Sequence, residues 1–175
     1  MLFTATPLDG VFVIDLKKIT DERGFFARGW CRDTLAANGL NPNQTQLNVG
    51  FSHRRGTLRG LHFQKAPHAE VKIVRCTRGA VFDVAVDLRE DSATRGQWFG
   101  VELSADNHKQ LYVPEGFAHG YQTLEEDSEI EYSTTHVYAA ASAGGVRYDD
   151  PAFGIRWPLP VSVISDADRK WASFK

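Results

Sequence analysis

The sequence has no excess of charge of either sign. It contains 20 Lys and Arg residues against 22 Asp and Glu residues, and its formal net charge is -2. A protein that binds DNA or RNA through the phosphates usually shows a basic stripe or patch. This composition gives no such footprint, so we expect no nucleic-acid partner.

Long apolar runs are also missing. No run approaches the roughly 20 residues that a membrane helix needs. The first ten residues lack the basic start and the apolar middle of a signal peptide. We therefore expect a cytoplasmic protein with no membrane partner.

Cysteine is scarce, with only Cys31 and Cys76. Their spacing matches no metal motif, and one pair is weak evidence for a disulfide in a chain of this size. We expect both thiols to be reduced. The six His residues include no His-x-His pair. Metal binding by a histidine cluster is therefore a rival interpretation and not the first one.

Helical periodicity is nearly absent, whereas short runs rich in Val, Ile, Phe, Tyr and Thr recur between turn residues. This pattern predicts an all-β fold, either a sandwich or a closed barrel. The length of 175 residues suits one core, so we predict a single domain, 1–175. Strands are expected at 11–16, 25–30, 44–48, 58–64, 71–77, 81–88, 98–103, 109–113, 117–124, 130–138 and 154–157. Short helices are expected at 33–38, with Asp33 as N-cap, and from Ser165 onward.

The stretch from Leu58 to Gln64 stands out because it places polar side chains in a strand that is otherwise apolar. Buried polar groups need partners or a chemical role. Strict alternation would put Arg59 and His62 on opposite faces of the strand. Both reach one cavity only if the strand twists or bulges, and a bulge is cheapest at Gly60.

Two other segments alternate strictly. In 44–48, Gln46 and Asn48 share one face with Gln44, and this face either meets solvent or lines a wet cavity. In 130–138, Tyr132 and Tyr138 share one face. These residues are candidates for the wall of a site.

A histidine backed by a carboxylate can move a proton next to a carbonyl. His62 could act as the general base, with Asp168 or Asp83 fixing its tautomer. Lys72 or His119 could stabilise an enolate oxygen. Tyr132 could return a proton from the opposite face of the carbanion, which inverts a stereocentre.

Each candidate also has a structural interpretation. His62 could be a hydrogen-bonded core histidine, and Tyr132 a packing aromatic. Lys72 could extend along an edge strand, and Asp168 could belong to a capping box begun by Ser165. His119, beside a glycine, could lie at the surface. The combination of these residues favours function.

Several long motifs, in one order, make the chain similar to the dTDP-4-dehydrorhamnose 3,5-epimerase family over nearly its whole length. The motifs are Asp21 to Phe26, Leu58 to Gln64, Phe82 to Arg89, Pro114 to Gly120, Asp150-Pro151 and Ile155 to Pro158.

The resemblance implies an all-β, cupin-type jelly-roll β-barrel with a few short helices. It implies that His62 is the base, Asp168 its orienting partner, Tyr132 the acid and Lys72 the group that stabilises the enolate. The substrate-binding residues that it implies are Arg23, Phe26, Gln46, Asn48, Arg59, Lys72, His119 and Tyr138.

The implied reaction removes a proton from a carbon beside the C4 ketone of a nucleotide-linked 4-keto-6-deoxy sugar and returns it on the other face. Neither a metal nor a nicotinamide cofactor is needed. The resemblance also implies a homodimer in which an N-terminal segment is exchanged. Arg23 and the Phe25-Phe26 pair would then serve the neighbour's site.

This chain departs from the family pattern at ligand contacts. Arg28 stands where Glu is usual, Glu70-Val71 replaces the common Gln-Gly before the lysine, and Ala143 and Ala167 replace an expected Glu and Lys. These departures affect the choice of nucleotide or sugar more than the chemistry.

Three alternatives follow. A single-centre 3- or 5-epimerase would use the same residues, since the ligand pose decides which proton leaves. A 3,4-ketoisomerase is less well supported because such relatives typically lack the acid tyrosine, here Tyr132. A non-catalytic cupin sugar-binding module should have lost the base or its partner, and both His62 and Asp168 are present.

Overall fold

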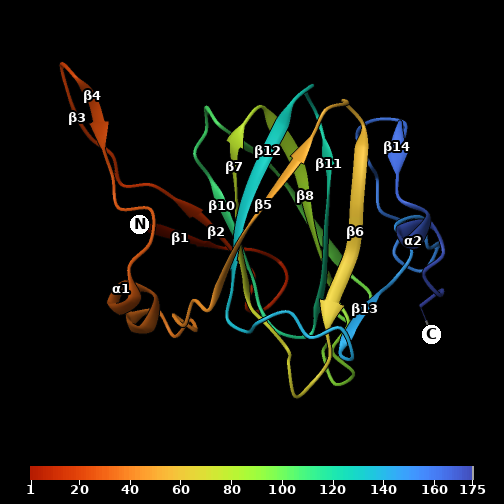
Figure 1. Cartoon of the computed structure of the whole chain (residues 1–175). Coiled ribbons are helices and arrows are strands. Elements are labelled where there is room, and N and C mark those ends of the chain that lie inside the picture. Colours follow the sequence, from red (N-terminus) through yellow and green to blue (C-terminus); the bar gives the residue numbers. More distant parts are fainter. Residues whose placement is uncertain (175) are drawn as a thin grey trace.

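Two antiparallel sheets face each other and form the body of the protein (Figure 1). The computed structural model describes residues 1–174, so the last residue of the predicted domain lies outside it. One sheet has the order β1-β2-β10-β7-β12-β5 and the other β13-β6-β11-β8-β9. Within the described residues the two sheets are not joined edge to edge by a ladder. The all-β jelly-roll prediction is confirmed, as two packed sheets and not as a closed barrel.

The strand bounds follow the sequence pattern closely. The first sheet contains β1 (Leu2–Ala5), β2 (Phe12–Asp15), β5 (Gln46–Ser52), β7 (Lys72–Arg78), β10 (Gln110–Val113) and β12 (Ser128–Thr134). The second contains β6 (Thr57–Gln64), β8 (Ala80–Asp87), β9 (Trp98–Ser104), β11 (Phe117–Thr123) and β13 (Ala143–Gly145), with β14 (Val163–Ile164) parallel to β6.

The strand β8 is buried on both of its faces. Val81 and Ala85 point between the sheets into the main core. Val84 and Val86 point the other way and pack against the segment that follows β13, including Phe153. The more apolar face of this strand is therefore covered by the C-terminal part of the chain. Burial of both faces explains why the sequence of β8 is a nearly continuous apolar run.

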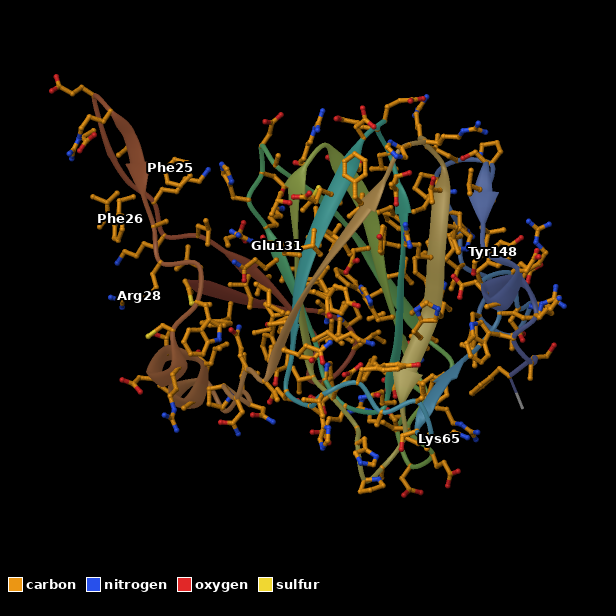
Figure 2. The ribbon with its side chains drawn as sticks, in the orientation of Figure 1. Phe25, Phe26, Arg28, Lys65, Glu131 and Tyr148 are labelled. Carbon is orange, nitrogen blue, oxygen red and sulfur yellow. The ribbon has the colours of Figure 1, made fainter. Side chains whose placement is uncertain are left out.

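A two-stranded arm leaves the body near the N-terminus. It consists of β3 (Ile19–Asp21) and β4 (Gly24–Phe26), which pair only with each other. Figure 2 shows Phe25 and Phe26 on this arm, away from both sheets. The exposed fraction of Phe26 is 73%. An apolar side chain this exposed marks a surface that lacks its cover within this chain.

The helices are short. α1 (Arg32–Ala37) and α2 (Asp166–Arg169) have six and four residues, and no helix in the described part of the chain is long and apolar enough to cross a membrane. The prediction of Asp33 as N-cap was wrong, because the helix begins one residue earlier with Cys31 at the N-cap, without a side-chain cap. The helix that follows Ser165 is confirmed.

Three predicted strands are shorter than expected or absent. The strand predicted at 25–30 ends at Phe26, where the arm offers no further partner. The strand predicted at 130–138 ends at Thr134, whose hydroxyl donates to the His136 carbonyl (2.7 Å) as the chain turns. The segment 154–157 is no strand. It begins with Gly154 at φ +60°, and its Trp157 indole donates to the Tyr148 carbonyl (2.9 Å).

Candidate active site

The bulge predicted at Gly60 is present between β6 and β11. His62 pairs with His119 and Arg59 with Tyr121, so the two residues Gly60 and Leu61 on β6 oppose the single residue Gly120 on β11. Gly60 has φ +120°, and a Cβ added there would lie 2.6 Å from the Gly120 Cα. Only glycine fits this backbone approach. The bulge turns Arg59 and His62 toward the same space.

That space is a cavity of about 400 Å³ between the two sheets. Most of the predicted site residues line it: Gln46, Asn48, Arg59, His62, Lys72, His119, Tyr132 and Tyr138. They come from strands that are distant in the sequence and belong to both sheets, among them β6 and β12 (Figure 1). The volume is in the range of small-ligand sites.

His62 and Asp168 form a close pair, with Nε2 of the imidazole 2.6 Å from Oδ1 of the carboxylate. The structure thus selects Asp168 over Asp83 as the partner of His62. Because Nε2 faces the carboxylate, Nδ1 is the nitrogen left for a ligand in the cavity. The His62 side chain is 47% exposed, so a ligand can reach it.

Asp168 is buried, and both of its carboxylate oxygens have hydrogen-bond partners. Its Oδ2 accepts a hydrogen bond from the Gly60 N–H (3.1 Å), and its Oδ1 also accepts one from the Trp171 indole (3.3 Å). Burial alone raises the pKa of Asp168, but the hydrogen bonds from His62, Gly60 and Trp171 outweigh it and the pKa lies below its usual value. The group is therefore a carboxylate at neutral pH.

The capping role and the pairing role of Asp168 coexist. Its backbone N–H donates to the Ser165 hydroxyl (3.0 Å) at the start of α2, while its side chain faces His62. Sequence reasoning treated these as alternatives, and both hold. The helix N-terminus fixes the backbone from which the carboxylate extends.

Lys72 is the first residue of β7, in the interior of its sheet and not at an edge, and it is 7% exposed. Its Nζ lies 3.2 Å from Glu70 Oε1 and donates to the His62 carbonyl (3.3 Å). Burial lowers the pKa of Lys72, although the charges of Glu70 and Asp83 oppose this effect. The edge-strand interpretation of Lys72 was wrong.

Tyr132 extends into the cavity from β12, in the sheet opposite His62. Burial raises the pKa of Tyr132, the charge of Glu70 raises it further, and Arg59 opposes them. The phenol is therefore protonated at neutral pH and can donate. A base and an acid on facing sheets can approach the two faces of one ligand.

His119 is buried and forms a second histidine–carboxylate pair, with its Nε2 2.8 Å from Asp83 Oδ1. The surface interpretation of His119 was wrong. Asp83 Oδ2, also buried, has no hydrogen-bond partner among the described residues. His119 and Lys72 both line the cavity, and the charge of Asp83, behind His119, acts on the Lys72 ammonium.

Polar side chains of Arg59, Gln46 and Asn48 also line the cavity. The Arg59 guanidinium is oriented by the Ser52 hydroxyl (3.2 Å) and the Phe51 carbonyl (2.9 Å). Gln46 donates to Asn48 (2.7 Å) and accepts from the Tyr138 N–H (3.1 Å). Tyr138 thus reaches the cavity from the loop after β12 and not from a strand.

Arg23 and Phe26 are not in this cavity. They lie on the arm, where Arg23 is paired with Asp21 and its side chain is 84% exposed. Of the departures from the family pattern, Glu70 and Ala143 line the cavity, and Val71 is in a core cluster. Arg28 lies near the arm (Figure 2), and Ala167 is exposed on α2.

Trp171 is a cavity residue that sequence reasoning missed. Its indole lies edge-on to the His62 ring, with 6.2 Å between centroids, and it contacts Asp168. The signal was its position three residues after Asp168, close to one helical turn. For metals, no group of three or more His, Cys, Asp or Glu side chains within residues 1–174 is arranged to hold an ion.

Comparisons with known proteins identify the family of this chain. The family model described as dTDP-4-dehydrorhamnose 3,5-epimerase matches residues 5–175. The protein of that name from Sinorhizobium fredii is 46% identical over 173 residues, covering 96% of this chain and 87% of the relative. The crystal structure of the Bacillus anthracis protein of that name, with TDP and PPi bound, has a TM-score of 0.95, 39% identity and 99% coverage of both chains.

A more distant similarity is to a 3'-monoepimerase from Streptomyces bikiniensis in complex with dTDP-quinovose. Its TM-score is 0.87 at 31% identity, covering 96% of this chain and 85% of that one. The fold and the cavity define the class of the protein, a cupin-type sugar epimerase. The chain belongs to the dTDP-4-dehydrorhamnose 3,5-epimerase family.

Proposed function

We propose that the protein inverts C3 and C5 of a dTDP-linked 4-keto-6-deoxy sugar. His62 is the base, Asp168 orients it, Lys72 stabilises the enolate and Tyr132 is the acid. The observation that carries the proposal is the 2.6 Å contact of His62, on one sheet, with Asp168 of α2, together with the position of Tyr132 on the opposite sheet.

Each inversion follows from these positions. His62 Nδ1 takes the proton from the carbon beside the C4 ketone, and the C–H electrons move to the ketone oxygen. The ammonium of Lys72 donates to this enolate oxygen. The enolate then collapses as carbon takes a proton from the Tyr132 hydroxyl on the opposite face, and solvent exchange restores both groups.

The nucleotide end of the substrate is assigned to the polar side of the cavity. Arg59 offers the bidentate geometry that suits a diphosphate, and Gln46, Asn48 and His119 offer hydrogen bonds. The Bacillus anthracis relative with bound TDP supports a thymidine nucleotide. The cytoplasmic location expected from the sequence stays a prediction.

The arm supports a homodimer with exchanged N-terminal segments. Its apolar side chains Ile19, Phe25 and Phe26 are exposed in the single chain, and Arg23 has no contact with its own cavity. In the dimer, Arg23 and Phe26 of one subunit complete the site of the other. An exchanged segment of this kind is self-complementary across a two-fold axis.

Mixing two inactive variants tests the exchange. Arg23→Ala and His62→Asn subunits, refolded together in equal amounts, should recover up to about a quarter of wild-type activity, since half of the dimers then have one intact site. If each arm instead completes the site of its own subunit, mixing the two variants would restore no activity. Light scattering of the unmixed wild type gives the oligomeric state independently.

The reaction is tested by incubating the protein with dTDP-4-keto-6-deoxyglucose in deuterated water and following C3 and C5 by NMR. Deuterium at both carbons is the expected result. Deuterium at one carbon would assign the protein to the single-centre epimerases, an alternative favoured by its similarity to a 3'-monoepimerase. No incorporation, with the nucleotide bound, would contradict the proposal.

A further inference from the structure

Glu70 is a largely covered carboxylate on the cavity wall that the proposed chemistry does not use. It precedes β7, and 10% of its side chain is exposed. Its Oε1 lies 3.2 Å from Lys72 Nζ, and its Oε2 accepts a hydrogen bond from Gln64 Nε2 (3.1 Å). Both carboxylate oxygens are therefore directed at specific partners within the site.

The backbone holds Gln64 in one orientation. The two N–H groups of its side-chain amide are shared between Glu70 and the His68 and Val137 carbonyls (3.0 and 3.2 Å), and its Oε1 accepts from the Ala139 N–H (2.6 Å). A rotation of this amide would break bonds to two separate segments. Because Gln64 is fixed, it fixes Glu70 in turn.

The ammonium of Lys72 has three N–H donors. Within the described residues two acceptors lie close to it, Glu70 Oε1 at 3.2 Å and the His62 carbonyl at 3.3 Å. Two N–H groups are thus directed into the wall. The third remains for the cavity, where an enolate oxygen would form.

We propose that Glu70 is a positioning residue that holds the Lys72 ammonium so that one N–H donor faces the sugar ketone. This inference rests on the proposed function and deepens it. Glu70 acts through Lys72 and does not itself exchange a proton with the sugar.

The charges around Lys72 agree with this arrangement. Burial lowers the pKa of Lys72, and Glu70 is the first of the groups that oppose this effect. Burial is the main cause of the raised pKa of Tyr132, and the charge of the same carboxylate raises this pKa further. One largely covered negative charge thus favours the ammonium form of the lysine and the phenol form of the tyrosine, which are the two forms that the reaction requires.

Other titratable groups face this region from each neighbouring strand. They are His62 on β6, Asp83 on β8, His119 on β11 and Tyr132 on β12. Strand β10 contributes Val113 opposite Lys72 and no charge. Replacing Glu70 by Gln removes only the Glu70 charge and leaves all of these other groups in place.

The first experiment compares Glu70→Gln with wild type and with Glu131→Gln. Glu131 is also in an ion pair, with Arg75 at 2.6 Å, but Figure 2 shows it on the side of β12 away from β6. We expect Glu70→Gln to reduce kcat about 10- to 100-fold with KM changed less, because it weakens positioning in the transition state. The alkaline limb of its pH–rate profile should move to lower pH. Glu70→Asp should recover part of the loss, and Glu131→Gln should match wild type.

Two results would overturn the inference. If Glu70→Gln matches wild type in rate and in pH profile, Glu70 has a packing role only. If Glu70→Gln abolishes solvent exchange as completely as His62→Asn, Glu70 moves the proton itself and is a catalytic residue.

A second measurement does not depend on turnover. Lysine labelled with ¹³C at Cε reports the titration of Lys72, whose signal is identified by its loss in Lys72→Arg. The signal should titrate at lower pH in Glu70→Gln than in wild type, and equal titration would refute the contact. The two proteins could differ in this titration while the wild type exchanges no deuterium with the sugar. In that case the proposed function fails but the Glu70–Lys72 pairing stands.

Discussion

Arg59 and His62 face the same cavity although an unbroken strand would point them to opposite sides. The register between β6 and β11 shifts between them, and Gly60 occupies the shift at φ +120°. The proposed base and the proposed phosphate-binding group are thus brought together by a backbone feature and not by their spacing in sequence. The same glycine donates its N–H to Asp168 (3.1 Å), which connects the bulge to the catalytic pair.

Replacing Gly60 with Ala should destabilise the fold by about 2–4 kcal/mol, from backbone strain and overpacking. The added Cβ would lie 2.6 Å from the Gly120 Cα and 2.8 Å from the His119 carbonyl oxygen, and backbone atoms move little. Gly24→Ala is the matched control, since Gly24 has φ +121° and no atom within 4 Å of an added Cβ. Urea unfolding measures both. Equal losses would mean that the close approach at Gly60 contributes nothing.

Replacing His62 with Asn should abolish solvent exchange at C3 and C5. Ligand affinity should stay within about tenfold of wild type, because the base acts mainly in the transition state. Asn retains a donor toward Asp168, so the buried carboxylate keeps a partner. Deuterium incorporation and dTDP titration by calorimetry check the two parts. Exchange that persists in this variant would remove His62 from the role of base.

Replacing Tyr132 with Phe should separate exchange from inversion. The base still forms the enolate, so some deuterium should enter with the original configuration, while inversion falls by about 10²–10⁴-fold, the usual effect of removing an acid. NMR distinguishes the two products by their coupling constants. A variant that inverts at the wild-type rate would show that Tyr132 only packs.

Replacing Asp87 with Asn should reduce stability without touching the cavity. Burial raises the pKa of Asp87, but hydrogen bonds from Arg89, Ser92 and Thr94 outweigh it and lower the pKa to about 2. Because the folded pKa lies below the unfolded one, this stabilisation is present above about pH 4 and is lost as the pH falls through about 2. The cost at pH 7 should be roughly 2 kcal/mol.

Urea unfolding at pH 7 and at pH 2.5 checks the Asp87 prediction, since the gap between wild type and variant should narrow in acid. Asp149→Asn is a control, because Asp149 is paired with Arg147 in a partly exposed position. Its change should stay within about 0.5 kcal/mol. A gap for Asp87→Asn that is the same at both pH values would contradict the linkage.

The sequence determined the fold class because alternating apolar residues specify sheets locally. Most strands lie within a residue or two of the predicted bounds. The bulge at Gly60 was also predictable, since polar residues on both faces of an apolar strand leave few other solutions. The family motifs added the predicted roles of His62 as base, Tyr132 as acid and Lys72 as the group that stabilises the enolate, which spacing alone left open.

Only the tertiary structure decided which groups meet. The residues alone left both Asp168 and Asp83 as partners of His62, and only the family resemblance implied Asp168; packing assigned Asp168 to His62 and Asp83 to His119. Trp171 entered the site because α2 docks against β6. Local pattern specifies which face of a strand is apolar, but contacts between residues about a hundred positions apart depend on how the sheets pack. The arm stands apart for the same reason, since its exposed apolar side chains find no cover among the described residues.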